Sequence, residues 1–371
     1  MSFALILRPH DVLLFRDGKP FSAGTDTRAR SLFPPTPFTV QGAIRARVLF
    51  SSGVSLAAYA TSPSDSAVQA LRQKIGFASQ SYGQLRLQGP FLARQEEGIW
   101  VRYFPAPADI VQCNGQYHLL QPQRNLPFES NLPEGLVWSW IHTPDQVENP
   151  RGWISEAQLR RYLEGQPPMQ LVQEDEFVLH EPRFGIALQA ETKTVQEGFL
   201  YMVDFLRLKE EVAFWVELDG IQPSDLGGEQ GFLQLGGEAR VVWYRREESR
   251  PLPRMALLPE QFKVVLLTPA WFAEGWRPKD WCTFFSGSVR LVAAVIPRYQ
   301  SLGGAYVDDQ HRRGAFQKPL RRFVPAGSVF YFEHDGEAIY NGQPFTETPA
   351  GEGDFGQIGF GCAVIGKWAY T

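Results

Sequence analysis

The residues most able to do chemistry lie in one basic stretch, residues 298–322, which glycine and proline punctuate. From 290 to 322 the chain carries seven Lys or Arg residues against two acids, Asp308 and Asp309. Strand-like runs flank the stretch, so the sequence predicts a basic loop held between two strands. Such a loop is suited to binding phosphates. Its cations are Arg298, Arg312, Arg313, Lys318, Arg321 and Arg322.

Residue types that perform catalysis are sparse and scattered. The six histidines show no metal-ligand spacing such as H-x3-H, so the sequence predicts no metal site. No serine lies in a complete G-x-S-x-G turn. The one carboxylate–imidazole cluster, Asp308, Asp309 and His311, lies in the basic loop, where adjacent aspartates are usually solvated. We therefore expect no catalytic residue, no metal and no cofactor, and a protein that is not an enzyme.

Three further segments could contact an anion, although each also has an ordinary structural interpretation. Arg16 and Lys19 flank a predicted turn, which either touches phosphate or is a plain hairpin. Gly359 and Gly361 lie in a glycine-dense C-terminal segment, where backbone N–H groups either form an anion site or pack closely in a strand. Lys193 either reaches RNA or an adjacent subunit, or lies in a solvated hairpin.

The elements that must position these residues are mainly strands. Alternating and β-branched runs predict strands near both ends of the chain and throughout its second half. Prolines lead into a predicted helix over 39–50, and a second helix is predicted over 156–164. Runs of strands with few helices predict an α+β fold rather than a doubly wound sheet. We expect two domains, 1–190 with an irregular insertion at about 95–185, and 191–371 with a glycine-rich C-terminal strand.

Composition excludes several classes of protein. The chain has 371 residues, 44% of them hydrophobic and 20% charged, which indicates a globular protein large enough for two domains. A net charge of −4 argues against general coating of nucleic acid. The charge is uneven, because residues 95–200 carry fifteen acids against seven bases and the tail from 323 onward is acidic. Three widely spaced cysteines and the lack of a long apolar run predict a soluble protein of a reduced, cytoplasmic compartment.

Eight short segments, in order along nearly the whole chain, resemble those of one known family. They are LLFRDGKPF with PPTPFTVQGAIRARV, GPFL, YFPAPAD, EPRFGIALQAETKTVQEGFLY, GGEARVVW, LLTPAWFAEGW, RFVPAGSVFYF and GFGCAVIGKW. The family is that of the third Cmr subunits of type III-B CRISPR effector complexes, in the RAMP superfamily. Family members often have Gly-Gly-Trp-Asp where this chain has Gly303-Gly304-Ala305-Tyr306, which leaves any role of that tryptophan or aspartate without a counterpart.

The resemblance implies two ferredoxin-like (RRM-like) domains with insertions. It implies a non-catalytic RNA-binding subunit in an antiviral ribonucleoprotein, holding the 5′ tag of the CRISPR RNA. The partners implied are the large polymerase/nuclease-type subunit and an adjacent RAMP backbone subunit. The acidic segment and tail would face protein. The residues expected to contact RNA are Arg16, Lys19, Arg28, Arg30, Arg45, Arg47, Lys193, Arg298, Tyr299, Gly303, Gly304, His311, Arg312, Arg313, Phe316, Lys318, Arg321, Arg322, Gly359 and Gly361.

Two other functions stay open at the level of sequence. One is a metal-independent endoribonuclease that cuts CRISPR repeat RNA, with His10 or His311 as the general base. The other is a purely architectural subunit, whose basic loop docks an acidic protein surface and touches no RNA.

Overall fold

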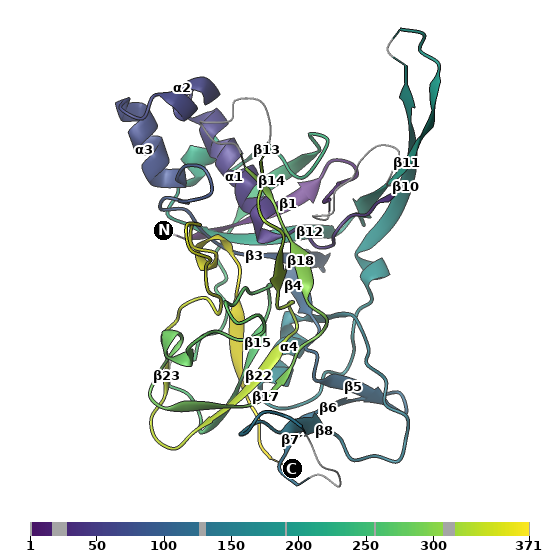
Figure 1. The fold of residues 1–371 in the computed structure, drawn as a ribbon, viewed down its shortest axis with the longest axis vertical. Coiled ribbons are helices and arrows are strands. Elements are labelled where there is room, and N and C mark those ends of the chain that lie inside the picture. Colours follow the sequence, from purple (N-terminus) through teal and green to yellow (C-terminus); the bar gives the residue numbers. More distant parts are fainter. Residues whose placement is uncertain are drawn as a thin grey trace. The chain divides into compact units, whose positions relative to one another are not determined.

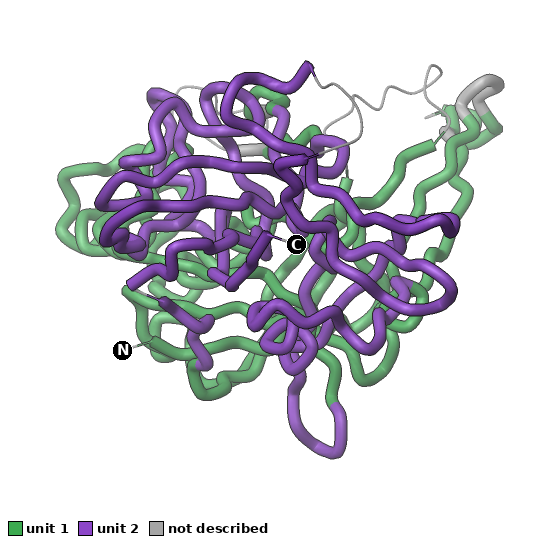
Figure 2. The backbone as a smooth tube through the Cα atoms, turned by 90° about the horizontal axis from the view of Figure 1, so that it is seen from below, with its two compact units in different colours: residues 1–95, 175–249, 301–321 green, residues 96–174, 250–300, 322–371 purple. Residues whose placement is uncertain are grey.

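The structure is a computed structural model that describes residues 2–16, 28–125, 131–189, 191–255, 257–306 and 316–370. The chain forms two compact units, and each is assembled from three separate stretches of sequence (Figure 2). Unit 1 comprises residues 1–95, 175–249 and 301–321, and unit 2 comprises residues 96–174, 250–300 and 322–371. The predicted domain boundary at 190/191 falls inside unit 1, between two strands that pair with each other.

Unit 1 is built on antiparallel strands in the order β13-β14-β1-β12-β3 (Figure 1). Three helices follow β1, and a long hairpin, β10–β11, precedes β12. The bounds are β1 Phe3–Pro9, β2 Arg28–Ala29, α1 Pro37–Ser51, α2 Leu56–Thr61, α3 Ser66–Ile75, β3 Arg86–Glu96, β10 Val178–Leu188, β11 Val195–Leu208, β12 Val212–Asp219, η2 Pro223–Leu226, β13 Gln230–Gln234, β14 Val241–Glu247, β19 Ala305–Tyr306 and β20 Phe316–Gln317.

Unit 2 is built on four antiparallel strands in the order β17-β22-β15-β24. Shorter ribbons surround this sheet, and β4 pairs with β9 just before α4. The bounds are β4 Ile99–Pro105, β5 Ile110–Cys113, β6 Gln116–Leu119, β7 Gln121–Gln123, β8 Trp138–Trp140, β9 Trp153–Ser155, α4 Glu156–Leu163, β15 Gln261–Leu266, η3 Trp281–Thr283, β16 Phe285–Ser286, β17 Val289–Val295, β22 Val329–His334, β23 Ile339–Tyr340, η4 Gly356–Ile358 and β24 Ala363–Lys367. Three short elements lie where the chain passes between units: η1 Glu174–Glu176, β18 Gln300–Leu302 and β21 Arg321–Phe323.

Local sequence explains the helix α1. Thr36 is its N-cap, and the Thr36 hydroxyl accepts a hydrogen bond from the backbone N–H of Thr39. Pro37 occupies the first helical turn, where its missing N–H costs nothing. Buried side chains then recur on one face, including Val40 and Ile44. The predicted helix over 39–50 is therefore confirmed, two residues longer at its start and one at its end.

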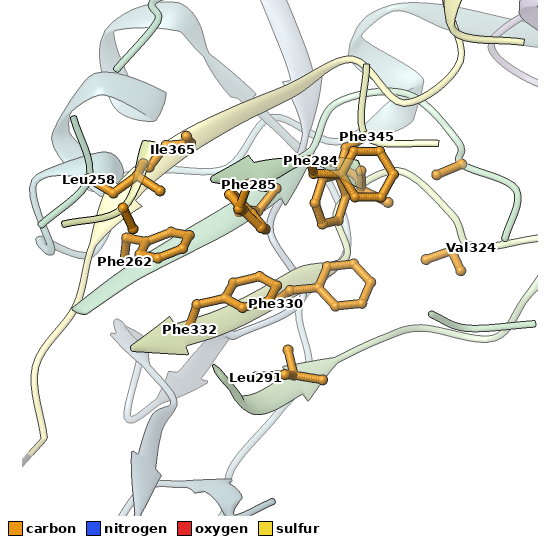
Figure 3. Close-up of a cluster of buried hydrophobic side chains, with 14 of the residues drawn as sticks. Leu258, Phe262, Phe284, Phe285, Leu291, Val324, Phe330, Phe332, Phe345 and Ile365 are labelled. Atoms are coloured by element: carbon orange, nitrogen blue, oxygen red, sulfur yellow. The ribbon is translucent and has the colours of Figure 1, made fainter. Parts of the chain in front are cut away.

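The core of unit 2 is rich in phenylalanine (Figure 3). The rings of Phe262 and Phe332 stack with centroids 5.2 Å apart and an angle of 12° between their planes. Trp281 meets Phe332 edge-on at 4.9 Å, so η3 is held against the sheet by ring contacts. Each buried aromatic side chain stabilises the fold by about 1.5–3 kcal/mol relative to an exposed one.

The fold as a whole is α+β, as the sequence predicts: mainly antiparallel sheets with few helices. The helix predicted over 156–164 is confirmed as α4. Sequence reasoning missed α2 and α3, and it took the segment from 95 to 185 as an irregular insertion although that segment contains the strands β4 to β9 of unit 2 and the start of β10 in unit 1. In the part of the chain that the structure describes, none of the helices has the length and apolar character needed to cross a membrane.

Candidate nucleic-acid interface

The basic stretch that the sequence singles out is described only at its two ends. Residues 298–306 and 316–322 belong to the structure, and they include two pairs of short strands, β18 with β21 and β19 with β20. The predicted contacts His311, Arg312 and Arg313 lie outside the described residues, as does the side chain of Phe316. The predicted turn residue Lys19 lies outside them as well.

The two described ends of the stretch meet on the surface of unit 2, where Tyr299 from the first end contacts Arg322 from the second. Tyr299 is 45% exposed, and the guanidinium carbon of Arg322 lies 4.8 Å from the centre of its ring. Arg298 precedes this ring and is exposed too. A guanidinium held on an aromatic face keeps most of its N–H groups available for phosphate. The geometry suits contact with a nucleic-acid backbone, with a ring beside it that can stack on a base.

Lys318, four residues before Arg322, is buried rather than presented at the surface. Its ammonium donates a hydrogen bond to the Tyr82 hydroxyl at 3.2 Å and lies 4.4 Å from the centre of the Phe38 ring. Its backbone N–H donates to the carbonyl of Gly304 at 2.7 Å. A Cβ added to Gly304 would lie 3.6 Å from the Lys318 side chain, in ordinary contact. In unit 1 these contacts fasten the start of the basic stretch, Gly303 included, to the start of α1.

The two predicted arginines of α1 are also tied into unit 1. Arg45 donates to the carbonyl of Ala78 at 3.1 Å, and its guanidinium lies 5.6 Å from the ring centre of Tyr82. Arg47 donates to the carbonyl of Leu226 at 2.8 Å and lies over the ring of Tyr244. Both side chains are half-buried, so in this structure they join α1 to its neighbours rather than standing free in solvent.

Arg16, Arg28 and Arg30 lie in or near β2, the short strand beside β11 of the β10–β11 hairpin. All three are exposed, and β2, which contains Arg28, runs parallel to β11. The bridge between Arg16 and Ser31 closes the segment, and the Ser31 hydroxyl donates to a β11 carbonyl. Beneath them lies a small core that includes Phe205. These three predicted cations are thus exposed in the described part of unit 1.

One face of the β10–β11 hairpin is apolar and exposed. Phe184 is 73% exposed, Leu200 is 57% exposed and Val195 is 56% exposed. Cross-strand partners share a face, so Phe184 with Met202 and Ile186 with Leu200 form a continuous stripe. Figure 1 shows the hairpin projecting from the strands of unit 1. Lys193 lies near its tip, exposed and with a φ of 57°.

Sequence reasoning weighed this hairpin only for its charges. The apolar stripe is the feature that it missed, although alternation of Phe184, Ile186 and Leu188 is visible in the printed sequence. The same alternation is equally typical of a strand with one buried face, so the sequence alone does not distinguish the two. A two-stranded ribbon with an exposed apolar face indicates a surface that another molecule covers.

Gly359 and Gly361 are buried inside unit 2. The Gly359 carbonyl accepts from the Thr268 hydroxyl at 2.7 Å, and the Gly361 N–H donates to the Pro269 carbonyl at 2.8 Å. A Cβ on Gly361, whose φ is 66°, would lie 2.7 Å from the backbone of Phe345. Of the two interpretations of this segment, close packing is what the structure shows at Gly361.

The strongest electrostatic feature of unit 2 lies in its interior. The carboxylate of Asp109 accepts hydrogen bonds from the hydroxyls of Tyr162 and Tyr331 at 2.7 Å and 2.6 Å, and the Lys263 ammonium lies 3.4 Å away. All four side chains are buried. Burial lowers the pKa of Lys263, which the Asp109 charge opposes. Burial, and then the same carboxylate, raises the pKa of both tyrosines well above its usual value.

This interior cluster serves the fold, since its members join α4, β15 and β22 to the segment before β5. Among the described residues, no group of three or more His, Cys, Asp or Glu side chains is placed to hold a metal ion. His10, one of the two predicted bases of the alternative nuclease, is exposed at the end of β1, and His311 lies outside the described residues.

Comparison with known proteins adds one strong relationship and several weak ones. The family model described as CRISPR-associated protein (Cas_Cmr3) matches residues 5–368. A chain in the cryo-EM structure of the type III-B Cmr-beta bound to cognate target RNA and AMPPnP is 18% identical, with a TM-score of 0.47, over 88% of this chain and 86% of that chain. A chain in the crystal structure of a Csm1–Csm4 cassette in complex with AMPPNP is 11% identical, with a TM-score of 0.38, over 100% and 99%. No curated protein matches the chain.

Proposed function

The chain belongs to the Cas_Cmr3 family of CRISPR-associated proteins, and we propose that it is a non-catalytic RNA-binding subunit of a type III-B CRISPR effector complex. The family match runs over nearly the whole chain and bears out the resemblance on which the sequence analysis relied. In the proposed role the subunit holds the 5′ tag of the CRISPR RNA and contacts the large polymerase/nuclease-type subunit and a neighbouring backbone subunit.

The observation that carries the RNA-binding proposal is the surface pair formed by Tyr299 and Arg322, with Arg298 beside it. A guanidinium 4.8 Å from an exposed aromatic ring offers both kinds of contact that single-stranded RNA requires, namely charge for phosphate and a ring for a base. The pair joins the two described ends of the basic stretch. Arg16, Arg28 and Arg30 are further exposed cations, in unit 1, for which we propose contact with RNA.

The apolar β10–β11 hairpin supports the proposed assembly with other subunits. Exposure of Phe184 and its neighbours on the stripe to water costs about 25 cal/mol for each Å² of apolar surface. A partner that covers the stripe would recover that free energy. The exposed arginines beside β11 would then lie close to the junction of protein and RNA.

We also infer that each unit is a modified ferredoxin-like domain. In unit 2 the four strands occur along the chain as β15, β17, β22 and β24, and they lie side by side in the sheet as β17-β22-β15-β24. Numbered along the chain, this is the order 2-3-1-4, and all neighbours are antiparallel. In unit 1 the strands β1, β3, β12 and β14 follow the same order, with β13 added outside β14. The order and polarity are those of a β-α-β-β-α-β domain. Short 3-10 segments stand where several of the helices would be.

The RNA role can be tested with the surface pair. We expect Arg298→Gln with Arg322→Gln to weaken binding of tag-bearing CRISPR RNA, and to reduce the slope of log K against log salt by about 1.4, since two phosphate contacts are lost on a single strand. Arg277→Gln is the matched control, because Arg277 is 46% exposed in unit 2 and also lies beside a tryptophan. An unchanged slope in the double variant, measured by fluorescence anisotropy over a salt series, would remove these arginines from the RNA surface.

The non-catalytic part of the proposal needs its own test. Labelled repeat RNA incubated with the purified chain, with and without EDTA, should stay intact. Cleavage in EDTA would favour the nuclease alternative, and His10→Ala would then show whether the exposed histidine acts as the base.

A further inference from the structure

A second surface of unit 2 combines aromatic rings with positive charge, and it lies on the β7–β8 ribbon. Trp138 and Trp140 are each 41% exposed and project from the same face of β8, since they are two residues apart on a strand. Their cross-strand partners are Gln123 and Gln121, whose amides therefore lie on the same face. The backbone positions that carry the two indoles are thus about 6.8 Å apart along the strand, with hydrogen-bonding groups alongside.

Two arginines next to this ribbon share one acidic partner. Arg124 and Arg290 both donate to the single carboxylate of Glu333, which is only 12% exposed. Two guanidinium groups on one carboxylate leave one positive charge in excess. The Arg124 side chain is 60% exposed and that of Arg290 is 56% exposed, so several of their N–H groups face solvent.

The carboxylate and a ring hold Arg124 in place. Its guanidinium carbon lies 4.3 Å from the centre of the Tyr370 ring, and the Tyr370 hydroxyl donates to Glu333 at 2.8 Å. Tyr370 is itself packed edge-on against Trp368 at 4.8 Å. The cation is therefore fixed before any ligand arrives, which reduces the entropy lost on binding.

The arginines lie next to the ribbon that carries the indoles. Arg124 follows Gln123 directly, at the end of β7. On the other side, the N–H of Val137 donates to the carbonyl of Val292 at 2.9 Å, which joins β8 to β17, and Arg290 lies on β17 two residues before Val292. In Figure 1, β7 and β8 are drawn beside the C-terminal end of the chain, in agreement with the contact between Arg124 and Tyr370.

We propose that this surface, formed by Trp138, Trp140, Arg124 and Arg290, is a second site for single-stranded RNA, bound without sequence preference. The proposal rests on the proposed function in taking RNA as the ligand. The exposed indoles offer aromatic surface on which bases can stack, and the exposed arginines offer charge for phosphates. An acidic protein surface would engage the guanidinium groups but has no use for two exposed indoles.

The test uses the full chain and an oligouridylate of about 12 nucleotides, which contains no tag and lies within the usual site size of single-strand grooves. We expect Trp138→Ala with Trp140→Ala to weaken binding at least about tenfold, since each lost base–ring stack costs a factor of about five or more. We expect Arg124→Gln with Arg290→Gln to flatten the salt slope by about 1.4. The matched control is Phe232→Ala with Arg245→Gln, because Phe232 is 56% exposed and Arg245 is exposed on unit 1.

Conservative variants separate binding from folding. Trp138→Phe with Trp140→Phe should keep most of the affinity, and Arg124→Lys with Arg290→Lys should keep the salt slope. Affinity within about twofold of the unmodified chain in the alanine variant would overturn the proposal. Polyglutamate serves as the probe for an acidic protein surface. The proposal is also overturned if Arg124→Gln with Arg290→Gln abolishes binding of polyglutamate but retains binding of oligouridylate, because that result identifies an acidic protein surface as the ligand.

The ratio of affinities for tag-bearing and scrambled RNA separates this proposal from the proposed function. Ribbon variants should lower both affinities and leave the ratio unchanged. If the unmodified chain shows no preference for the tag while the ribbon variants still lose oligouridylate, tag recognition fails and the second site stands. The reverse outcome, a tag preference with unaffected ribbon variants, overturns the second site alone.

Discussion

Replacing the buried Asp109 by asparagine should destabilise unit 2 severely. Asparagine keeps the size of the side chain and can still accept hydrogen bonds from Tyr162 and Tyr331. It removes the charge that compensates Lys263, whose side chain is 1% exposed. At 3.4 Å and an effective dielectric constant of about 20, that attraction is worth about 5 kcal/mol.

The expected loss is therefore about 3–5 kcal/mol, the range seen when one partner of a buried ion pair is removed. The free energy of unfolding can be measured by urea denaturation followed by tryptophan fluorescence. This signal reports mainly on unit 2, because of the ten tryptophans only Trp215 and Trp243 lie in unit 1. The unit 2 transition should move to lower urea with its slope unchanged.

A second substitution checks the cause. Adding Lys263→Met to Asp109→Asn removes the uncompensated charge, so the double variant should be more stable than the single one. The reasoning is refuted if Asp109→Asn lowers the free energy of unfolding by less than about 1 kcal/mol. It is also refuted if Lys263→Met lowers the free energy of unfolding as much in the Asp109→Asn variant as it does in the unmodified chain.

Three further predictions follow from the packing and charge. Phe332→Ala should cost about 3–5 kcal/mol by leaving a cavity in the aromatic core, measured by the same denaturation. The pKa of both Tyr162 and Tyr331 is raised, so their stabilising effect is complete below pH 10 and is lost as pH rises. The pKa of Lys263 is lowered, so its titration raises the free energy of unfolding with pH, but only up to its usual pKa of 10.5. Above pH 10.5, the free energy of unfolding should fall with pH by at most about 2.7 kcal/mol per pH unit, because two tyrosine protons are lost more readily from the unfolded chain. A free energy of unfolding that stays constant from about pH 10 to 12 would contradict this prediction. Phe184→Ser should change stability by about 0.5 kcal/mol or less while weakening assembly with neighbouring subunits, as co-purification would show.

The elements that sequence reasoning found are those with local causes. The helix α1 has its cap at Thr36, its proline in the first turn and its apolar face within fifteen residues, so all the evidence is close together in the chain. The strand β22, predicted from 328 to 332, is likewise a short apolar run between turn residues. Such features depend little on the remainder of the fold.

The division into units was not accessible in this way. Strand β1 pairs with β12 and β14, which lie more than two hundred residues further on, and each unit collects three stretches of sequence. A boundary drawn at one point in the chain therefore has no counterpart in the structure. Pairing of distant strands depends on which faces are buried together, and periodicity along one segment carries no information about that.

The candidate site shows the same limit. Lys318 and Arg322 are equivalent in the sequence, since both are cations of one basic stretch. The structure buries Lys318 against Tyr82, 236 residues away, and exposes Arg322 over Tyr299. The direction in which a cation points depends on the long-range contacts of its neighbours. Composition predicted a basic surface, and only the fold shows which cations belong to it.

The central claim is most directly tested by binding of the purified chain to CRISPR RNA with an intact or a scrambled 5′ tag, at one fixed salt concentration. The account predicts that the intact tag binds more tightly, and that Arg298→Gln with Arg322→Gln weakens this binding while Arg277→Gln does not. Equal affinity for the two RNAs, in the chain alone and in its complex with the large subunit, would contradict it.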